Sequence, residues 1–590
     1  MSCLSYPYDS AAIMQKKRAI KRELKAKPDL VPKKIAIMSG STVGEIKNIL
    51  ELFLLDNGIE PTFYEGGYGL FYENLMFDDG SLANFAPDII YIHTSNKNIK
   101  NYPSQNDNEK AVQDKLNAEY SRFESIWNVA KRYNCPVIQN NFELPSYRIM
   151  GNKDAVSANG RVNFIERLNA RFAEYAGANE NFYINDIHYL SASIGLDNWA
   201  SPSAWYAYKY MLATEHIPLL CQSIANIIKS LFGKNKKSLI LDLDNTLWGG
   251  IIGDDGAEGI ELGSETPTGM AYSEFQSYLK ELSQMGIMLN VCSKNEESTA
   301  LTGFERADSI LKRDDFVVFK ANWEPKHINV NNIAKELNIL QDSFVFADDN
   351  PAEREIVRRE INGISVPELT APEEYIKIID KSGFFEVTNL SQDDKKRNEM
   401  YKQNIERATL EQSFGDYTDY LKSLEMHCDI GAFDTEHSAR ITQLINKTNQ
   451  FNLTTRRYTD AEITALIGDD SHITLYGRLV DKFGDNGIVT AIIGAVNGDT
   501  LNIELWIMSC RTFKRHLEYA IFDRLTEICR NRGITTINGI YYPTAKNLLV
   551  SEYYATIGFK PNGDINGGKS FIYTVQNEEK MNKVMEVNIL

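Results

Sequence analysis

The chain has 590 residues, of which 43% are hydrophobic and 24% charged, and its formal net charge is −17. This length predicts three or four domains, because a single hydrophobic core seldom serves more than about 250–300 residues. The composition is that of a globular protein rather than a disordered one. The negative charge argues against nonspecific binding to nucleic acid or to an anionic membrane.

The cysteines and the N-terminal residues indicate the compartment. Seven cysteines are scattered along the chain without CxxC spacing, which is typical of reduced thiols in the cytoplasm. The first residues lack the apolar stretch of a signal peptide, and no apolar run approaches the ~20 residues that a membrane-spanning helix needs. We therefore expect a soluble, cytoplasmic protein.

The N-terminal region alternates between strand and helix patterns after a basic, helical leader at Lys16–Lys27. Alternation of this kind predicts a doubly wound α/β domain with a parallel sheet, as in flavodoxin. The polar ends of its strands would then share one edge of the sheet. Strands are predicted at 34–39, 61–64, 88–93 and 136–139, and helices at 43–57 and 113–133.

The predicted edge of this first sheet resembles that of SGNH-type esterases, with Ser39 or Ser41 as the candidate nucleophile. The Asp-x-x-His pattern of that family does not follow, because Asp186 and His188 are separated by a single residue. We therefore expect this domain to bind or to cap rather than to hydrolyse. Residues 160–235 are predicted to be mostly helical, with aromatic side chains packed between layers.

The stretch Ser238–Leu241 is a short apolar run that leads directly into Asp242 and Asp244. This pattern predicts a buried parallel strand with two carboxylates at its C-terminal end. Two such carboxylates repel each other unless a cation or a shared proton accommodates them. The alternative interpretation is an Asx-turn at the end of a strand.

Three further apolar stretches, at 287–291, 316–319 and 343–347, predict neighbouring strands of the same sheet. The first ends at Ser293 and the last at Asp348 and Asp349, while Lys326 opens a helix between them. Four aspartates at one edge, with no histidine or cysteine ligand among them, indicate Mg²⁺. A hydroxyl group and an ammonium group suit the oxygens of a phosphoryl group. One carboxylate can attack phosphorus while a second transfers the proton.

The ordered set D-x-D-x-T, S, K and DD is similar to the haloacid dehalogenase (HAD) superfamily of phosphohydrolases. The segments LDLDNTLWGGIIGDDG, VCSKN, NWEPK and FADDNP resemble its FkbH-type branch, HAD subfamily IIIC. The resemblance implies that Asp242 is the nucleophile, Asp244 the general acid/base and Lys326 a charge-screening lysine. Thr246, Ser293, Asn295 and Lys326 would bind the phosphate. Asp242, the Asp244 backbone carbonyl, Asp348 and Asp349 would hold Mg²⁺.

The spacing of these motifs leaves no room for a full cap domain. Only Gly249–Gly263 is available, and its composition predicts a hairpin flap. Such an open site needs a large substrate or a lid from another domain. Cys292, next to Ser293, is a candidate acyl-carrying thiol, because FkbH-type glyceryl transferases are thought to carry an acyl group on an enzyme thiol. The alternative is a simply packed cysteine at the end of a strand.

The C-terminal region begins after a charged helical connector, Asp393–Ser413, which is predicted to have a solvated face. The order of its elements and the final Y-x-x-x-G-F resemble GNAT acyltransferases, which have an α+β fold. The resemblance implies that Tyr554 would protonate the departing thiolate. The predicted elements are a helix at 439–451, antiparallel strands at 473–480, 487–495 and 500–508, a helix at 514–531 and a strand at 535–541.

This region departs from the GNAT pattern at Cys510–His516, which contains no glycine. The family's phosphate loop is R-x-x-G-x-G/A, because glycines let backbone amides approach phosphate. The domain therefore either binds a phosphopantetheine arm without a nucleotide or has lost acyl transfer. Arg511, with its basic neighbours Lys514 and Arg515, belongs either to an anion site or to a surface cluster.

The expected organisation is thus an SGNH-like domain with a helical connector (1–235), a Rossmann-like HAD phosphatase domain with a minimal cap (236–390), a charged helical linker (391–416) and a GNAT-like domain (417–590). The expected function is a Mg²⁺-dependent phosphohydrolase that acts through a phospho-aspartate. It would dephosphorylate a phosphorylated acyl donor and pass the acyl group to the thiol of an acyl carrier protein.

Two alternatives stay open. One is a phosphatase for a sugar phosphate or another biosynthetic phosphate ester, with the flanking domains as a lid or scaffold. The other is a non-catalytic assembly protein that binds a carrier. In each case the partner is a phosphorylated small molecule or a carrier-linked substrate, and neither nucleic acid nor a membrane.

Overall fold

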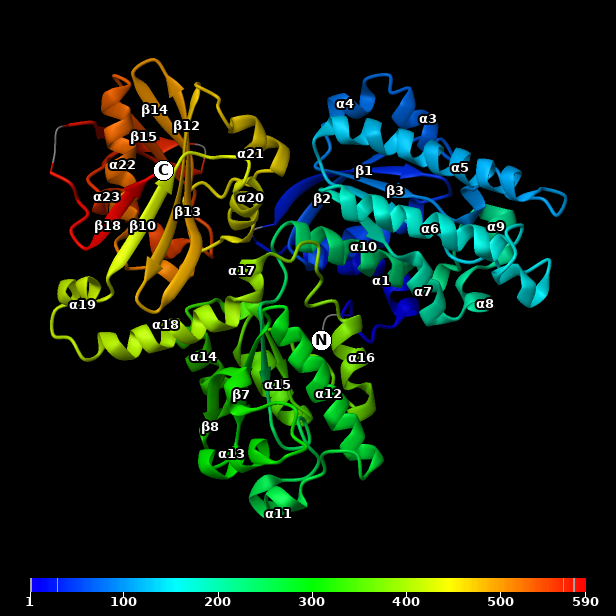
Figure 1. Cartoon of the computed structure of the whole chain (residues 1–590), viewed down its shortest axis with the longest axis horizontal. Helices are drawn as coiled ribbons and strands as arrows, with labels where there is room; N and C mark the ends of the chain where they lie inside the picture. Colours follow the sequence, from blue (N-terminus) through cyan, green and yellow to red (C-terminus); the bar gives the residue numbers. More distant parts are fainter. Residues whose placement is uncertain (1–2, 29, 566, 577–578) are drawn as a thin grey trace. The chain divides into compact units, whose positions relative to one another are not determined.

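The computed structural model describes residues 3–28, 30–565, 567–576 and 579–590. The chain divides into two compact units, residues 1–231 and 232–590. Figure 1 shows that every part of the chain combines helices with strands. The predicted multidomain α/β fold class is confirmed.

The first unit is built on a five-stranded parallel sheet in the order β2-β1-β3-β4-β5. This is the flavodoxin-like order, in which ligands bind where the strand order reverses, here between β1 and β3. Residues in β3 are buried throughout, as expected for a parallel strand covered on both faces. The strands are β1 (Val31–Ser39), β2 (Ile59–Glu65), β3 (Ile89–His93), β4 (Val137–Asn140) and β5 (Phe182–Asn185).

Helices cover both faces of this sheet. One strand, β5, lies in the region predicted to be mostly helical, because four residues are too few to produce a recognisable strand pattern. The helices are α1 (Ser10–Lys25), α2 (Gly44–Asp56), α3 (Phe71–Met76), α4 (Ser81–Phe85), α5 (Glu109–Ala130), α6 (Arg161–Ala178), α7 (Ile187–Ile194), α8 (Leu196–Trp199), α9 (Pro202–Tyr208) and α10 (Ile217–Leu231).

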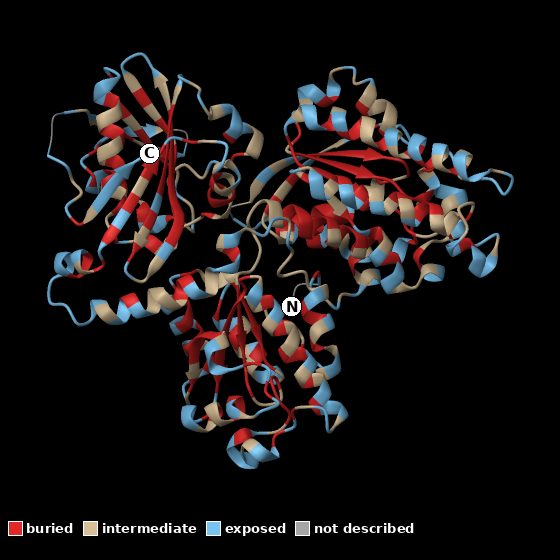
Figure 2. Ribbon diagram, viewed as in Figure 1, coloured by how far each residue is buried: buried red, intermediate tan, exposed pale blue. Residues whose placement is uncertain are grey.

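The second unit begins with a four-stranded parallel sheet in the order β8-β7-β6-β9. Figure 2 shows these strands as buried, which agrees with their apolar sequences. The strand order reverses between β6 and β9, so a ligand site is expected at the carboxyl ends of these two strands. The strands are β6 (Ser238–Leu241), β7 (Met288–Ser293), β8 (Phe316–Ala321) and β9 (Phe344–Ala347).

The segment predicted as a hairpin flap, Gly249–Gly263, is different in the structure. An antiparallel bridge between Gly249 and Glu261 closes its base, but the intervening residues form a short helix kinked at Gly256. Helices flank the sheet on both sides. They are α11 (Ile252–Gly259), α12 (Pro267–Gln284), α13 (Glu297–Glu305), α14 (Lys326–Leu337), α15 (Pro351–Glu360) and α16 (Tyr375–Lys381).

The charged connector is helical, as predicted, in α17 (Gln392–Lys395) and α18 (Arg397–Glu411). The connector is not solvated along its whole length, because Asp394 and Arg407 are buried. The Arg407 guanidinium forms an ion pair of 2.7 Å with Asp481. A run of charges therefore packs against the following domain through ion pairs, which the sequence pattern does not reveal.

The C-terminal sheet has the order β16-β17-β15-β14-β13-β12-β10-β18. The predicted antiparallel strands β12 to β14 and the strand β15 are confirmed, whereas β10, β11, β16, β17 and β18 were not predicted. The helix predicted at 439–451 ends at Lys447, and β11 lies beyond it. The strands are β10 (Met426–Gly431), β11 (Phe451–Asn452), β12 (His472–Asp481), β13 (Gly484–Asn497), β14 (Thr500–Met508), β15 (Thr536–Tyr541), β16 (Lys560–Ile565), β17 (Gly568–Thr574) and β18 (Met585–Ile589).

Strands β14 and β15 are parallel but pair only from Thr500 to Asn502. Beyond that point the short strand β11 pairs with β14 instead, and Tyr542 donates its backbone N–H to the Leu453 carbonyl over 2.9 Å. The chain thus fills the gap between the diverging strands with its own residues.

The helices of this domain are α19 (Tyr417–Ser423), α20 (Ser438–Lys447), α21 (Asp460–Leu466), α22 (Leu517–Asn531) and α23 (Tyr553–Thr556). Within the described ranges, every helix is too short or too polar to cross a membrane.

Candidate active site

Asp242 and Asp348 come together because β6 and β9 are adjacent and parallel. Leu241 and Ala347, the last residues of the two strands, are register partners. The Asp242 backbone N–H donates to the Ala347 carbonyl over 3.0 Å. The two carboxylates that follow these strands are 6% and 0% exposed, respectively. The sheet therefore holds two acidic side chains at the point where its strand order reverses.

Lys326 lies between these two carboxylates. Its Nζ is 2.7 Å from Asp242 Oδ2 and 2.6 Å from Asp348 Oδ2, and the residue is 4% exposed. Burial disfavours the ammonium form, yet the two carboxylates outweigh this effect and raise the pKa of Lys326. The lysine is therefore a permanent positive charge in the site, placed by the first turn of α14.

A third carboxylate, that of Asp349, completes an acidic cluster. One oxygen from each of Asp242, Asp348 and Asp349 lies within 4.8 Å of the others. Burial and the Asp242 carboxylate raise the pKa of Asp348 to about 6, against the opposing effect of Lys326. The same two causes raise the pKa of Asp349. One lysine therefore leaves the three carboxylates short of positive charge.

Asp242 Oδ1 is the most informative atom of the cluster. It is buried and has no hydrogen-bond partner in the part of the chain that the structure describes, whereas Oδ2 pairs with Lys326. A buried carboxylate oxygen without a partner is costly unless a ligand satisfies it. An oxygen-only donor set of three carboxylates fits a hard divalent cation such as Mg²⁺.

Asp244 faces a different set of partners from Asp242. Its Oδ1 accepts hydrogen bonds from Trp248 Nε1 and the Ile252 backbone N–H, over 2.9 and 3.0 Å. Its Oδ2 accepts one from Asn295 Nδ2 over 2.9 Å. The Asp244 side chain is thus outside the acidic cluster and is held in place by three donors. This agrees with an implied metal contact through its backbone rather than its carboxylate.

The predicted phosphate-binding residues lie around the two aspartates. Asn295 Nδ2 is 3.2 Å from Ser293 Oγ as well as bonded to Asp244. The Thr246 hydroxyl is fully buried and accepts the Asp349 backbone N–H over 3.2 Å. Ser293 and Asn295 therefore line the site from the end of β7, while Thr246 also fixes the backbone of a cluster residue.

Two tyrosines that the sequence did not single out for the site support its first turn. Tyr272 and Tyr375 both donate hydroxyl hydrogen bonds to the Asn245 carbonyl, over 3.2 and 2.9 Å. Asn245 has a left-handed φ of 53°, a conformation that asparagine tolerates better than most residues. Tyr272 fits the apolar spacing of α12, and Tyr375 lies far along the chain, so neither pattern indicates this role.

The candidate thiol, Cys292, is fully buried. Its Sγ contacts the Lys326 carbonyl over 3.6 Å, and burial raises the pKa of the thiol. Since a thiolate is the nucleophilic form, these surroundings favour the packed-cysteine interpretation over the acyl-carrying one.

The structure does not bring Tyr554 and Arg511 to a common open site. Tyr554 is 1% exposed and packs against Phe559 and Phe571 in the domain core. Its hydroxyl has no hydrogen-bond partner within the described part of the chain, and burial raises its pKa. Arg511 instead contacts Ser509 Oγ over 3.3 Å and lines a separate cavity. An acyltransferase role for this pair stays a prediction that the packing of Tyr554 does not favour.

Comparison with known proteins shows the family. A family model described as the FkbH N-terminal domain matches residues 34–229. A solved N-terminal part of a Bacteroides fragilis protein, which contains a phosphatase domain and is complexed with Mg, is 30% identical. The match covers 63% of this chain and 99% of that structure, with a TM-score of 0.59. No functionally curated protein matches.

Acetyltransferases are also among the similar structures. The ribosomal-protein-S18-alanine N-acetyltransferase of Escherichia coli is 11% identical over 26% of this chain and 99% of its own, with a TM-score of 0.21. A GNAT-family acetyltransferase of Staphylococcus aureus is 10% identical over 25% and 99%, with the same TM-score.

The fold and the site define a multidomain α/β protein with a phosphatase-type acidic centre at the edge of its second parallel sheet. The chain belongs to the FkbH-type family of the HAD superfamily.

Proposed function

We propose that the protein is a Mg²⁺-dependent phosphohydrolase that is transiently phosphorylated on Asp242. The observation that carries the proposal is the Asp242 carboxylate, whose Oδ2 is bound by Lys326 while the buried Oδ1 has no partner among the described residues. This arrangement leaves one oxygen, of fixed position, available to a phosphoryl group.

The residues of the chain suggest the following steps. Asp242 Oδ1 forms a bond to phosphorus while the bond from phosphorus to the leaving oxygen breaks. Asp244 gives the leaving oxygen a proton and then takes one from the water that releases phosphate. Its three hydrogen-bond donors keep that carboxylate in one orientation throughout.

The remaining site residues bind and screen charge. Lys326 offsets the negative charge of Asp242 and Asp348, and Ser293 and Asn295 hold phosphoryl oxygens. Mg²⁺ would be held by Asp242, Asp348 and Asp349, and it would supply positive charge next to the phosphoryl oxygens. The Mg complex of the Bacteroides fragilis structure supports this choice of ion.

The test is to trap the intermediate. The protein is incubated with a library of ³²P-labelled phosphate esters and acyl phosphates, quenched in acid and digested. We expect hydroxylamine-sensitive label on the peptide that contains Asp242, and no label in Asp242→Asn. Turnover in the library without label on Asp242 would contradict the proposal. An unlabelled, inactive protein across the whole library would favour the assembly-protein alternative.

A narrower proposal concerns the substrate. Membership of the FkbH-type family supports a phosphorylated acyl donor whose acyl group passes to a carrier thiol. In the part of the chain that the structure describes, only the short segment Gly249–Gly263 stands in place of a cap domain, which suits a large substrate. Incubation with 1,3-bisphosphoglycerate and an acyl carrier protein should then give a glyceryl adduct of the carrier, detected by mass spectrometry. An unmodified carrier together with rapid turnover of sugar phosphates would favour the plain phosphatase instead.

A further inference from the structure

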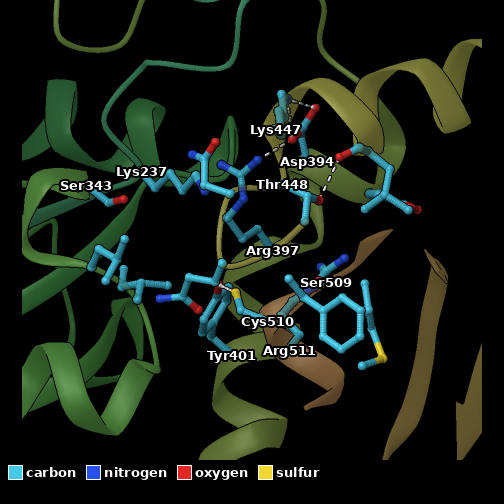
Figure 3. Close-up of a pocket in the computed structure, with 18 of the residues that line it drawn as sticks. Lys237, Ser343, Asp394, Arg397, Tyr401, Lys447, Thr448, Ser509, Cys510 and Arg511 are labelled. Atoms are coloured by element: carbon cyan, nitrogen blue, oxygen red, sulfur yellow. Dashed lines mark hydrogen bonds and ion pairs between the residues drawn. The ribbon is translucent and has the colours of Figure 1, made fainter. Parts of the chain in front are cut away.

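A second polar cavity lies within residues 232–590, away from Asp242, Asp348 and Asp349. Its volume is about 100 Å³, and one water molecule needs roughly 10–15 Å³ of such space, so it has room for several waters or for a small ligand. Figure 3 shows its lining side chains, which include Lys237, Arg397, Lys447 and Arg511. These residues are far apart in the sequence and converge only in the folded chain.

Positive charge prevails in this lining. Five basic residues face three carboxylates, namely Lys237, Arg397, Arg440, Lys447 and Arg511 against Asp342, Asp393 and Asp394. All three carboxylates already have basic partners. Asp394 pairs with Arg397 and Lys447, Asp393 with Arg440, and Asp342 with Lys546, which is not among the lining residues.

Lys237 and Arg511 account for the excess charge. Across the described ranges of the chain, neither forms an ion pair with a carboxylate. The Lys237 side chain is half-buried, and burial lowers its pKa, which means that the ammonium is poorly solvated. Among the described residues, the Arg511 guanidinium has Ser509 and Met400 as its side-chain hydrogen-bond partners. Asp342 attracts Lys237 only from beyond ion-pair distance. Two cations that lack a direct ion pair in one cavity are an arrangement that a phosphate group satisfies.

Neutral polar groups complete the lining. Gln450 Oε1 is buried and has no hydrogen-bond partner within the described residues. The Tyr401 hydroxyl and the Cys510 thiol, which also line the cavity, lie 3.7 Å apart. An unpartnered amide oxygen accepts hydrogen bonds only, so it suits a hydroxyl or N–H group on the ligand. The lining thus combines cations, which suit an anion, with an acceptor that suits a donor group.

This cavity is distinct from the phosphatase site. Lys237 directly precedes β6, whereas Asp242 directly follows it, so the two residues are about 16 Å apart along an extended strand at ~3.3 Å per residue. Asp342 and Ser343 likewise precede β9, whose other end leads to Asp348. The cavity therefore lies at the opposite ends of the two strands that carry the catalytic aspartates.

We propose that this cavity is a second binding site, for a small phosphorylated molecule that carries a hydroxyl or N–H group. Lys237 and Arg511 bind the phosphate group, and Gln450 accepts a hydrogen bond from the rest of the ligand. The bound phosphate is not the one that Asp242 attacks, because the two sites lie at opposite ends of β6.

Equilibrium dialysis of the full-length protein against ³²P-labelled inorganic phosphate tests this site. EDTA is present throughout, so that the uncompensated carboxylates at Asp242 repel phosphate from the phosphatase site. We expect Lys237→Met and Arg511→Gln each to weaken phosphate binding about tenfold, the effect of losing one charge-assisted contact. The exposed Arg359→Gln, on α15, is the matched control and should bind like the wild type. Lys237→Arg, which keeps the charge, preserves the test if the methionine variant fails to fold.

The ligand class is tested by comparing inorganic phosphate with glycerol 3-phosphate. The ester should bind more tightly, and Gln450→Met should remove that difference while leaving phosphate binding unchanged. Either compound should also slow the alkylation of Cys510 by iodoacetamide, but not that of the exposed Cys3. Absence of phosphate binding to the wild type, or equal binding by the wild type, Lys237→Met and Arg511→Gln, would overturn the proposal. Equal affinity for the two compounds would overturn the role of Gln450.

Discussion

The two parallel sheets of this protein have polar side chains at their carboxyl ends, but among the described residues only the second sheet gathers three carboxylates within 4.8 Å of one another. In the first sheet, Tyr91, His93 and Asn140 form a buried network: the Tyr91 hydroxyl is 2.7 Å from His93 Nδ1 and donates to Asn140 Oδ1 over 3.1 Å. Burial lowers the pKa of His93 to about 3, so the ring is neutral. In the second sheet, three carboxylates share one lysine.

This difference shows that position at a switch point does not by itself make an active site. Both edges lie where the strand order reverses, and both present oxygen and nitrogen atoms. At the first edge, the Asp186 carboxylate after β5 accepts hydrogen bonds from Asn141 and Tyr189. Only Ser41 Oγ and His93 Nε2 of the buried polar atoms named here have no partner within the described chain. The second leaves a buried carboxylate oxygen without a partner among the described residues and excess negative charge for a ligand to satisfy.

The largest expected effect separates the two edges directly. Asp242→Asn should lower the rate of phosphate release at least about a thousandfold, because the amide cannot accept the phosphoryl group. Ser41→Ala, at the corresponding edge of the first sheet, should change the rate less than about twofold. Steady-state assays of released phosphate with the best substrate of the library give both values. A large loss in Ser41→Ala would show that the first domain takes part in hydrolysis.

Lys326→Met should have the largest effect on stability. Removal of one partner from a buried ion pair costs about 3–5 kcal/mol, since the carboxylates of Asp242 and Asp348 are left unpaired. The matched surface variant is Lys320→Met, whose pair with Glu336 is partly exposed, and its cost should stay below about 1 kcal/mol. Denaturant unfolding without divalent cations measures both. Equal losses in the two variants would mean that the ion pairs of Lys326 with Asp242 and Asp348 do not stabilise the fold.

His93→Ala should destabilise the protein by about 2 kcal/mol, because it removes a buried ring and leaves the Tyr91 hydroxyl with one partner fewer. The phosphatase rate of the folded variant should match that of the wild type. Thermal unfolding and the phosphate assay together separate the two effects. A rate that falls without a loss of stability would assign the first edge a catalytic role.

Glu143→Gln should change how stability depends on pH. Burial raises the pKa of Glu143 to about 8 in the folded chain, above the ~4.3 of an unfolded glutamate. The carboxyl therefore stabilises the fold fully below about pH 4, and this contribution is lost as the pH rises to about 8.

The variant should gain on the wild type by about 1 kcal/mol per pH unit over that window. Unfolding free energies of the two proteins at pH 5 and pH 8 give the difference. Glu518, whose burial raises its pKa to about 7, is present in both proteins and cancels. A difference that does not vary with pH would show that Glu143 is ionised in the folded protein.

Much of the fold could be predicted because strand and helix periodicity is local. The strands at 34–39, 88–93 and 238–241 are long or apolar enough to be recognised, and alternation with helices indicates parallel sheets. Short or amphipathic elements were not predicted. Strand β5 has four residues, and β18 is largely exposed, so neither has a pattern that stands out from its surroundings.

The candidate site shows the same limit. The spacing of Asp242, Ser293, Lys326 and Asp348 indicated one shared edge, because parallel strands place their carboxyl ends together. It could not indicate that Tyr272 and Tyr375 both bond to the Asn245 carbonyl, since that contact depends on how two helices pack.

By itself, the sequence determined the class of chemistry: the residue types, their order and their positions after apolar strands are local properties that survive without coordinates. Only the tertiary structure decided which atoms are free. It pairs one oxygen of Asp242 with Lys326 and leaves the other without a partner among the described residues. It also buries Cys292 and Tyr554, and gathers Lys237 and Arg511 around a second cavity. These outcomes depend on burial and on contacts between distant segments. Whether a polar atom finds a hydrogen-bond partner is therefore a property of the packed chain.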